Sequence, residues 1–124
     1  MNPDFPLAQK YLAELYVEDP VHSDEAYSLA LKARNALPAD RELANTLGEI
    51  SYKKQNYPYA VECFYESARH APLRGKELYY LGMAQIQTGE TTSGQQALTR
   101  ALDTGLQEPL ATLARERLAA QSTK

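Results

Sequence analysis

The chain has 124 residues and a formal net charge of -3 at pH 7. A chain of this length forms one domain and buries roughly two thirds of the surface that it exposes when unfolded, so it needs no disulfide or metal ion to fold. Its Lys and Arg residues are scattered among carboxylates, whereas nucleic-acid-binding domains usually carry a clustered basic patch. Composition and charge therefore argue against nucleic-acid binding.

Cysteine content and hydropathy argue against a disulfide-bonded, membrane-spanning or secreted protein. Cys63 is the only cysteine, which excludes an internal disulfide, and it falls on the apolar side of an expected helix as a small buried residue. No apolar run approaches the ~20 residues that a membrane-spanning helix needs. Met1 to Pro6 lack the basic start and the apolar core of a signal peptide. We therefore expect a soluble protein that binds no membrane, with the cytoplasm as its default compartment.

Helical periodicity is almost continuous, and proline and glycine mark the ends of the helices. Seven helices are expected, at approximately residues 6–19, 23–37, 41–55, 58–71, 76–87, 92–104 and 109–120. Asp40 is the expected N-cap of the third helix, and Ser23 or Asp24 that of the second. Gly89 suits the left-handed conformation that ends the fifth helix, and Gly105 ends the sixth. Short connections between all seven helices favour an all-α stack of hairpins.

A period of 34 residues organises these helices, since Gly48 and Gly82 lie 34 positions apart and each follows a leucine. Ala60, Phe64 and Pro72 follow Gly48 by twelve, sixteen and twenty-four residues. A fixed period of this length is typical of stacked helical hairpins, in which each repeat packs against its neighbours. Repeat scaffolds of this kind bind partners and rarely catalyse reactions.

The residues at these positions resemble the tetratricopeptide repeat (TPR) pattern, most closely in residues 41–74. This segment carries the small and large residues of the pattern, Leu47-Gly48, Tyr52-Lys53, Asn56-Tyr57, Ala60, Phe64 and Pro72. The chain is similar to three repeats, at about residues 6–40, 41–74 and 75–108, with a capping helix at about 109–120, in a single domain of residues 1–124. Repeat three lacks the closing proline, and repeat one has one extra residue between Ala13 and Ala26. The resemblance implies an all-α fold, an α-solenoid of three antiparallel helix hairpins with a seventh, capping helix.

Small residues at the repeat positions have a packing role. Gly48, Gly82 and Ala13 are expected where the first helix of a hairpin touches the second, and Ala26 and Ala60 are their small counterparts. A missing side chain lets two helices approach to the short end of the usual interaxial range. Gly48→Leu is therefore predicted to destabilise the protein by overpacking.

The resemblance also implies a partner-binding groove, because in this family the first helix of each pair lines the concave face. The groove residues that it indicates are Lys10, Glu14, Asn45, Glu49, Tyr52, Lys53, Lys76, Tyr79 and Met83. Val17 and Ile86 complete the expected inner face. We expect Tyr79 and Met83 to be exposed anchors for partner side chains, with packing of Tyr79 or Ile86 against the neighbouring repeat as the alternative. The implied function is that of a non-enzymatic scaffold that binds a peptide or protein partner.

One subfamily of these repeats grips the terminal carboxylate of a peptide with Lys, Asn and Arg side chains. Lys10 and Lys76 occupy two of the five places, whereas the other three hold Glu14, Thr46 and Tyr80. A carboxylate at position 14 would repel the carboxylate of the ligand. An internal peptide segment or a folded partner surface is therefore expected instead.

Catalytic, metal and cofactor sites are not expected. His22 and His70 have no second His, Cys or carboxylate at a spacing typical of metal ligands, and no nucleophile has a base beside it. Self-assembly into a homo-dimer is the alternative function. The first helix carries more apolar groups than an inner face needs, among them Phe5, Leu7, Tyr11 and Leu15, which indicates pairing with a second copy or continuation into a longer repeat array.

Overall fold

The computed structural model describes residues 5–122. Within these residues the chain forms seven α-helices and no strand. The helices are α1 (Pro6–Tyr16), α2 (Ser23–Ala36), α3 (Arg41–Lys53), α4 (Tyr57–Ala68), α5 (Gly75–Gln87), α6 (Thr91–Asp103) and α7 (Leu110–Ser122), with a short 3-10 helix, η1 (Pro20–His22), before α2. The predicted single domain includes residues 1–4 and 123–124, which lie outside the described residues. Most of the segment compared with a signal peptide, residues 1–4, is therefore also outside them. The prediction of an all-α fold is confirmed.

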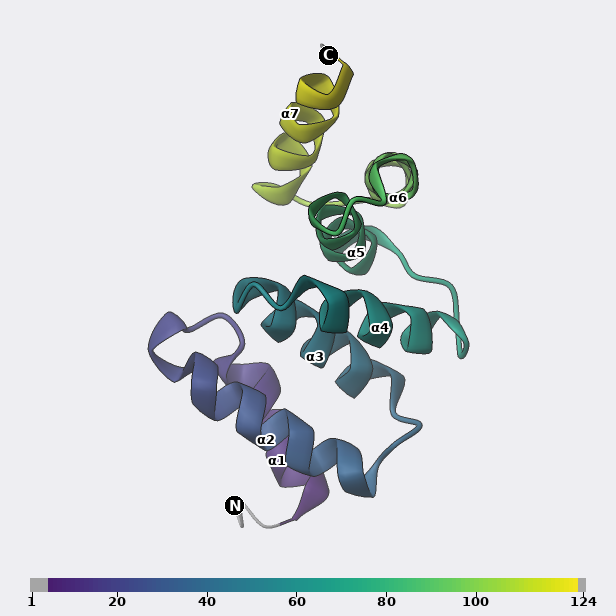
Figure 1. Ribbon diagram of the computed structural model, residues 1–124. Coiled ribbons are helices and arrows are strands. Elements are labelled where there is room, and N and C mark those ends of the chain that lie inside the picture. Colours follow the sequence, from purple (N-terminus) through teal and green to yellow (C-terminus); the bar gives the residue numbers. More distant parts are fainter. Residues whose placement is uncertain (1–4, 123–124) are drawn as a thin grey trace.

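The helices form antiparallel hairpins that stack in chain order, with the two ends of the chain at opposite ends of the stack (Figure 1). The closest pairs are α1 with α2, α3 with α4 and α5 with α6, and each hairpin packs on the next through α2 with α3 and α4 with α5. On one side of the stack α3 contacts both α1 and α5, while α7 packs against α5 and α6. This arrangement is the predicted α-solenoid, with α7 covering its C-terminal end.

Several predicted helix ends are confirmed. The carboxylate of Asp40 accepts a hydrogen bond of 3.0 Å from the backbone N–H of Leu43 and so caps α3. Gly89 and Gly105 follow α5 and α6 with φ of 92°, in the left-handed region that favours glycine. Local sequence chemistry therefore determines where these helices begin and end.

The start of α2 differs from the prediction. Ser23 and Asp24 were expected as N-caps, but α2 already includes both, and no side chain caps its first turn. The cause is η1, which leads directly into α2 and is itself capped by Asp19, whose carboxylate accepts from the Val21 N–H at 3.0 Å. The extra residue of the first hairpin falls in the same connection.

Two helices end earlier than their prolines indicated. α1 stops at Tyr16 and α4 at Ala68, about one turn before Pro20 and Pro72. A residue that precedes proline disfavours the helical conformation, so the chain must leave the helix before it reaches the proline. Short turns make this transition, and one of them is closed by the Asp19 N–H, which donates to the Tyr16 carbonyl at 3.0 Å.

Small residues stand at the helix contacts, as predicted. Ala13, Ala26 and Ala60 are fully buried. A Cβ atom built on Gly82 would lie 2.8 Å from the carbonyl oxygen of Gly94, so the backbones of α5 and α6 touch at this point. Close backbone approach therefore holds the third hairpin together, and any side chain at position 82 would force it apart.

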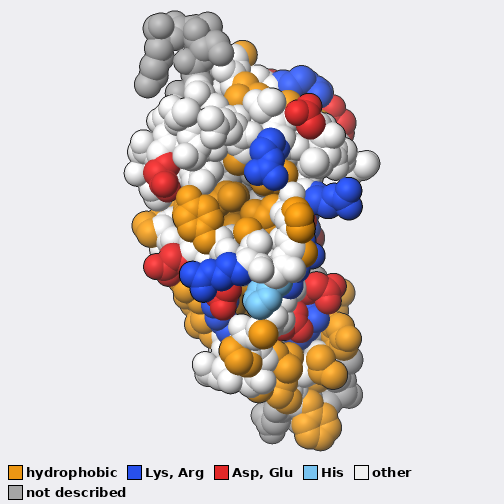
Figure 2. Space-filling model, turned by 90° about the vertical axis from the view of Figure 1, so that its right-hand side faces the viewer, with side chains coloured by type: hydrophobic (Ala, Val, Ile, Leu, Met, Phe, Trp, Pro, Cys, Tyr) orange, Lys and Arg blue, Asp and Glu red, His pale blue; other side chains and the backbone are white. Residues whose placement is uncertain are grey.

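No helix in residues 5–122 combines the length and the apolar character of a membrane span. Large apolar side chains are nevertheless exposed at the N-terminal end, namely Phe5, Leu7, Tyr11 and Leu15, which are between 53% and 69% exposed. Figure 2 shows hydrophobic side chains gathered at this end of the molecule. We call these four residues the N-terminal apolar surface. The expected excess of apolar groups on the first helix is thus present, and it lies uncovered in this single chain.

Candidate functional site

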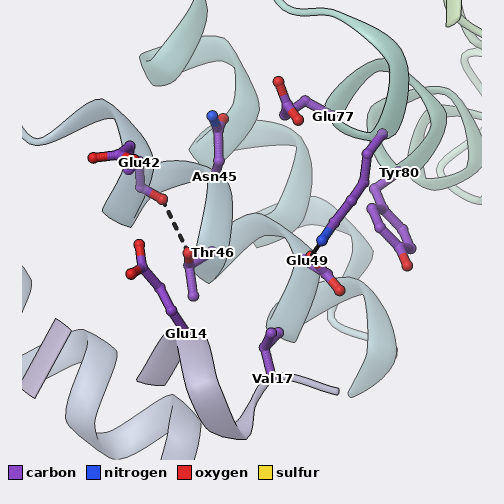
Figure 3. A pocket seen from close by; sticks show the side chains of 9 residues that line it. Glu14, Val17, Glu42, Asn45, Thr46, Glu49, Glu77 and Tyr80 are labelled. Carbon is purple, nitrogen blue, oxygen red and sulfur yellow. Dashed lines mark hydrogen bonds and ion pairs between the residues drawn. The ribbon is translucent and has the colours of Figure 1, made fainter. Parts of the chain in front are cut away.

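A pocket of about 280 Å³ opens on the side of the stack where α1, α3 and α5 meet (Figure 3). Its lining is mostly polar and comes from all three hairpins: Glu14, Val17, Glu42, Asn45, Thr46, Glu49, Lys76, Glu77 and Tyr80. On α3 the adjacent residues Asn45 and Thr46 lie three or four positions from both Glu42 and Glu49, which places all four on one face of the helix. The first helices of the hairpins thus build the pocket together.

One end of the pocket is electrically balanced. Glu49 is only 4% exposed, and its carboxylate lies 2.8 Å from the Lys53 ammonium and 2.9 Å from that of Lys76. Glu18 adds a second carboxylate, 3.4 Å from Lys53 and 3.6 Å from Lys76. Burial lowers the pKa of Lys76, but its contacts with Glu49 and Glu18 outweigh burial and raise the pKa above its usual value. Two ammonium groups therefore neutralise two carboxylates at this end.

The other end of the pocket carries an excess of negative charge. Lys10 is 5% exposed, and its ammonium donates to Asp40 at 2.9 Å and to Glu42 at 3.0 Å. Glu14 lies beside this cluster and has no ion pair among the described residues. Burial raises the pKa of the Glu14 carboxyl, and Glu42 and Asp40 raise it further against the attraction of Lys10. Three carboxylates share one ammonium here, because Lys10 is the cation that serves all of them.

Hydrogen-bond acceptors dominate this negative end. Figure 3 shows the side chains of Asn45, Glu14, Glu42 and Glu77 around the same opening. The Asn45 Oδ1 atom is buried and has no hydrogen-bond partner. The Thr46 hydroxyl donates to the backbone carbonyl of Glu42 at 3.0 Å, so its proton is already committed. This end of the pocket therefore offers acceptors to a ligand that donates hydrogen bonds.

The structure brings only part of the predicted groove together. Glu14, Asn45, Glu49 and Lys76 line the pocket. Lys10 and Lys53 lie beside it, each tied by an ion pair to one of its glutamates. Val17, expected on the inner face, is also part of the lining, whereas Ile86 is buried in the core.

At the aromatic end of the predicted groove, Tyr79 is buried rather than exposed, which agrees with the alternative that it packs in the core. Tyr79 was expected to be an exposed anchor, but it is 4% exposed and belongs to the core cluster that also contains Ala114 of α7. Met83 is half-buried against the same cluster, and Tyr52 packs its ring 5.3 Å from that of Tyr80. Packing in the core cluster that α5 shares with α7 therefore keeps Tyr79 and Met83 out of the pocket lining.

Sequence reasoning missed two glutamates of the pocket, Glu42 and Glu77. The 34-residue period indicates the position of Glu42, because Glu42 and Lys76 are 34 positions apart and occupy equivalent places in α3 and α5. Thr46 and Tyr80 are related by the same period, and both line the pocket. Extending the period from Lys76 would have identified Glu42 as a lining residue.

His22, one of the two histidines considered as metal ligands, has a structural role in the fold. His22 bonds through Nδ1 to the Asp19 carboxylate at 2.7 Å and stacks on Tyr16 with ring centroids 4.4 Å apart. Among residues 5–122 no group of three His, Cys, Asp or Glu side chains is arranged to hold a metal ion. His22 thus fastens the connection between α1 and α2.

Comparison with known proteins adds no relative. No protein-family model matches the chain, and no curated protein matches its sequence. The stacked hairpins and the 34-residue period are consistent with a helical repeat.

Proposed function

We propose that this chain is a non-enzymatic scaffold of the TPR type, which binds a segment of a peptide or protein partner in the pocket between α1, α3 and α5. The 34-residue period and the stacked hairpins support the repeat type. The observation that carries the binding proposal is the excess of negative charge at one end of the pocket, where Glu14, Glu42 and Asp40 share the ammonium of Lys10. Repulsion between these carboxylates destabilises the free protein, and a ligand of opposite charge relieves it on binding.

The chemistry of the negative end specifies the partner as a segment that presents an Arg or Lys side chain. Glu14 and Glu77 have no ion pair among the described residues, and Asn45 of the same lining has an unpartnered acceptor, Oδ1. A guanidinium or ammonium group supplies both the positive charge and several donors. The carboxylates of Glu14 and Glu77 and the amide oxygen of Asn45 are therefore complementary to a cationic side chain.

A terminal carboxylate is the wrong ligand for this pocket. The two lysines that resemble the carboxylate-binding subfamily, Lys10 and Lys76, are already paired with glutamates and aspartate of the chain itself. A ligand carboxylate would have to displace these partners and would also face Glu14. Both effects disfavour it.

Selection from a phage-displayed library of random dodecapeptides tests the proposal, followed by affinity measurements with labelled copies of the retained peptides. We expect Lys- and Arg-rich peptides whose affinity falls about tenfold in a Glu14→Gln, Glu77→Gln double variant, because two charge-assisted contacts are removed. Asn45→Arg should abolish binding, since it places a cation in the pocket. Glu62→Gln removes one negative charge from an exposed position on α4, outside the pocket, and is the control.

Two outcomes would count against the pocket. Peptides that bind the Asn45→Arg variant as tightly as the wild type would show that another surface is used. A library that yields no pocket-dependent peptide would do the same. Retained peptides that lose affinity for the Asn45→Arg variant but contain no Arg or Lys would agree with binding in the pocket. They would contradict the proposal that the partner presents a cationic side chain.

Self-assembly is a second candidate function, and the N-terminal apolar surface favours it. Leu15 and Phe5 are 69% and 62% exposed, and clustered exposed apolar side chains often mark a surface that binds another protein chain. Light scattering across micromolar concentrations tests it. We expect a dimer that a Leu7→Lys, Leu15→Lys double variant converts to a monomer. Leu113→Lys on α7, where the leucine is 44% exposed, is the control, and a wild type that stays monomeric throughout would contradict self-assembly.

A further inference from the structure

A second groove, of about 330 Å³, lies between α4 and α6 with α5 as its floor. Leu73, Leu78, Leu81 and Ala97 make its surface largely apolar. Figure 2 views the molecule from the side of α6 and the end of α4 and shows hydrophobic side chains gathered in the middle of this face, with charged side chains around them. The groove is separate from the pocket described above, since the two share no lining residue.

Gln85 distinguishes this groove from an ordinary surface depression. The side chain lines the groove, and the residue is only 4% exposed. Its Nε2 donates to the Tyr65 hydroxyl at 2.9 Å, but its Oε1 is buried and has no hydrogen-bond partner. A buried carbonyl oxygen without a donor is uncommon in folded proteins, because its lost hydration is not replaced. The amide oxygen of Gln85 therefore points to a ligand that donates an N–H.

Arg100 supplies a charge at the other end of the groove. It is exposed on α6 and makes no ion pair among the described residues. Ser93 lies at the Gln85 end, because neighbouring Gly94 packs against Ile86, the residue after Gln85. Seven residues separate Ser93 from Arg100, which corresponds to about 10 Å along a helix. About three residues of extended chain span that distance.

We propose that this groove is a second binding site, for an extended acidic segment of a protein partner. The segment donates a backbone N–H to Oε1 of Gln85 and lays an aliphatic side chain over Leu78 and Leu81. About three residues further along, an Asp or Glu side chain pairs with the guanidinium of Arg100. The ligand is opposite in charge to the one proposed for the pocket, so the two surfaces select different segments.

The test separates this groove from the pocket by using a protein with the pocket blocked. The Asn45→Arg variant, checked for native circular dichroism, is exposed to the random dodecapeptide library, and the affinities of the retained peptides are then measured. We expect an acidic residue about three positions from an aliphatic one. Arg100→Glu should weaken binding at least about tenfold by reversing the charge that the acidic residue meets. Lys32→Glu, an exposed charge reversal on α2, should leave affinity unchanged.

Gln85→Met tests the hydrogen bond, because it keeps the size of the side chain and removes its acceptor, together with the Nε2 donor to the Tyr65 hydroxyl. We expect a comparable loss of affinity. If that variant does not fold, the side-chain amide resonances of Gln85 in the Asn45→Arg protein provide the readout, and they should shift when the peptide is added. Three results would overturn the proposal: no retained peptide, equal affinity for the Arg100→Glu variant, or unshifted Gln85 resonances. None of these results affects the proposal for the pocket, which is tested by the separate peptide selection described above.

Discussion

The ring of Phe64 occupies the space that Gly48 leaves open, since a Cβ atom built on Gly48 would lie 2.6 Å from both Cε2 and Cζ of the ring. Phe64 is 1% exposed, and the contact joins α3 to α4 within the second hairpin. One period later, a Cβ on Gly82 would lie 3.0 Å from Cγ of Leu98. Two hairpins thus use the same combination of a missing side chain and a large apolar partner.

Gly48→Ala should therefore destabilise the protein, although alanine is the better helix former. Overpacking of a core typically costs about 1–3 kcal/mol, which exceeds the gain of about 1 kcal/mol in helix propensity. Urea denaturation measures the change in the free energy of unfolding. Phe64→Leu gives the added methyl group room, so the double variant should lose less stability than the two single variants together. Strict additivity would show that Phe64 is not the obstacle.

The fold could be predicted from the sequence because its determinants are local and periodic. Gly48 and Gly82 mark the repeat, and Asp40, Gly89 and Gly105 end helices through contacts with residues a few positions away. Such signals are visible in one chain without any knowledge of tertiary contacts. The capping prediction for Ser23 was wrong because the 3-10 helix before it leads directly into α2, which a local pattern does not reveal.

The pocket could be predicted only in part, because its lining depends on contacts between distant segments. Asn45 and Tyr79 occupy equivalent repeat positions, yet Asn45 lines the pocket while Tyr79 is buried in the core that includes α7. The periodicity of a helix cannot show which of its residues a neighbouring helix will cover. The pairing of Lys10 with Asp40 is also invisible locally, because thirty residues separate the two.

Lys10→Met should destabilise the protein at neutral pH by removing the cation that ties α1 to the start of α3. The loss should be about 2 kcal/mol, less than the roughly 3–5 kcal/mol for a fully buried pair, because Glu42 is largely exposed. Lys32→Met, an exposed change on α2, is the control and should have no effect. Urea denaturation at pH 7 compares the three proteins.

The same variant should show a defined pH dependence. Burial raises the pKa of the Asp40 carboxyl, but hydrogen bonds from Lys10 and from the Leu43 N–H outweigh burial and lower it. A lowered pKa in the folded state contributes stability above the unfolded pKa of about 3.9, which is lost as pH falls through the folded value. The difference between wild type and Lys10→Met should therefore shrink from pH 7 to about pH 2.5. An equal difference at both values would place the effect in packing of the lysine stem.

Glu14→Gln should stabilise the free protein. Burial and the carboxylates of Glu42 and Asp40 raise the pKa of Glu14, so its ionised form is less favourable in the folded chain than in the unfolded one. Glu14 therefore does not destabilise the wild type below the unfolded pKa of about 4.3, where the carboxyl is protonated. The free energy of unfolding falls as pH rises through the folded pKa of Glu14. We expect a gain of about 0.5 kcal/mol at pH 7 and none at pH 3.5, measured by thermal melting. Glu62→Gln is the control, and a destabilised Glu14→Gln variant would contradict the unbalanced charge of the pocket.

Cys63 provides a probe of how the second hairpin opens. It is 1% exposed, and burial raises the pKa of its thiol to about 11, so the reactive thiolate is scarce in the folded protein. Iodoacetamide at pH 8 should therefore label the native chain very slowly and the urea-unfolded chain at once. If labelling requires global unfolding, Gly48→Ala should accelerate it by the factor that corresponds to its loss of stability, about tenfold for each 1.4 kcal/mol. An equal rate in wild type and variant would instead show that Cys63 is reached through a local opening that leaves the contact between Gly48 and Phe64 intact.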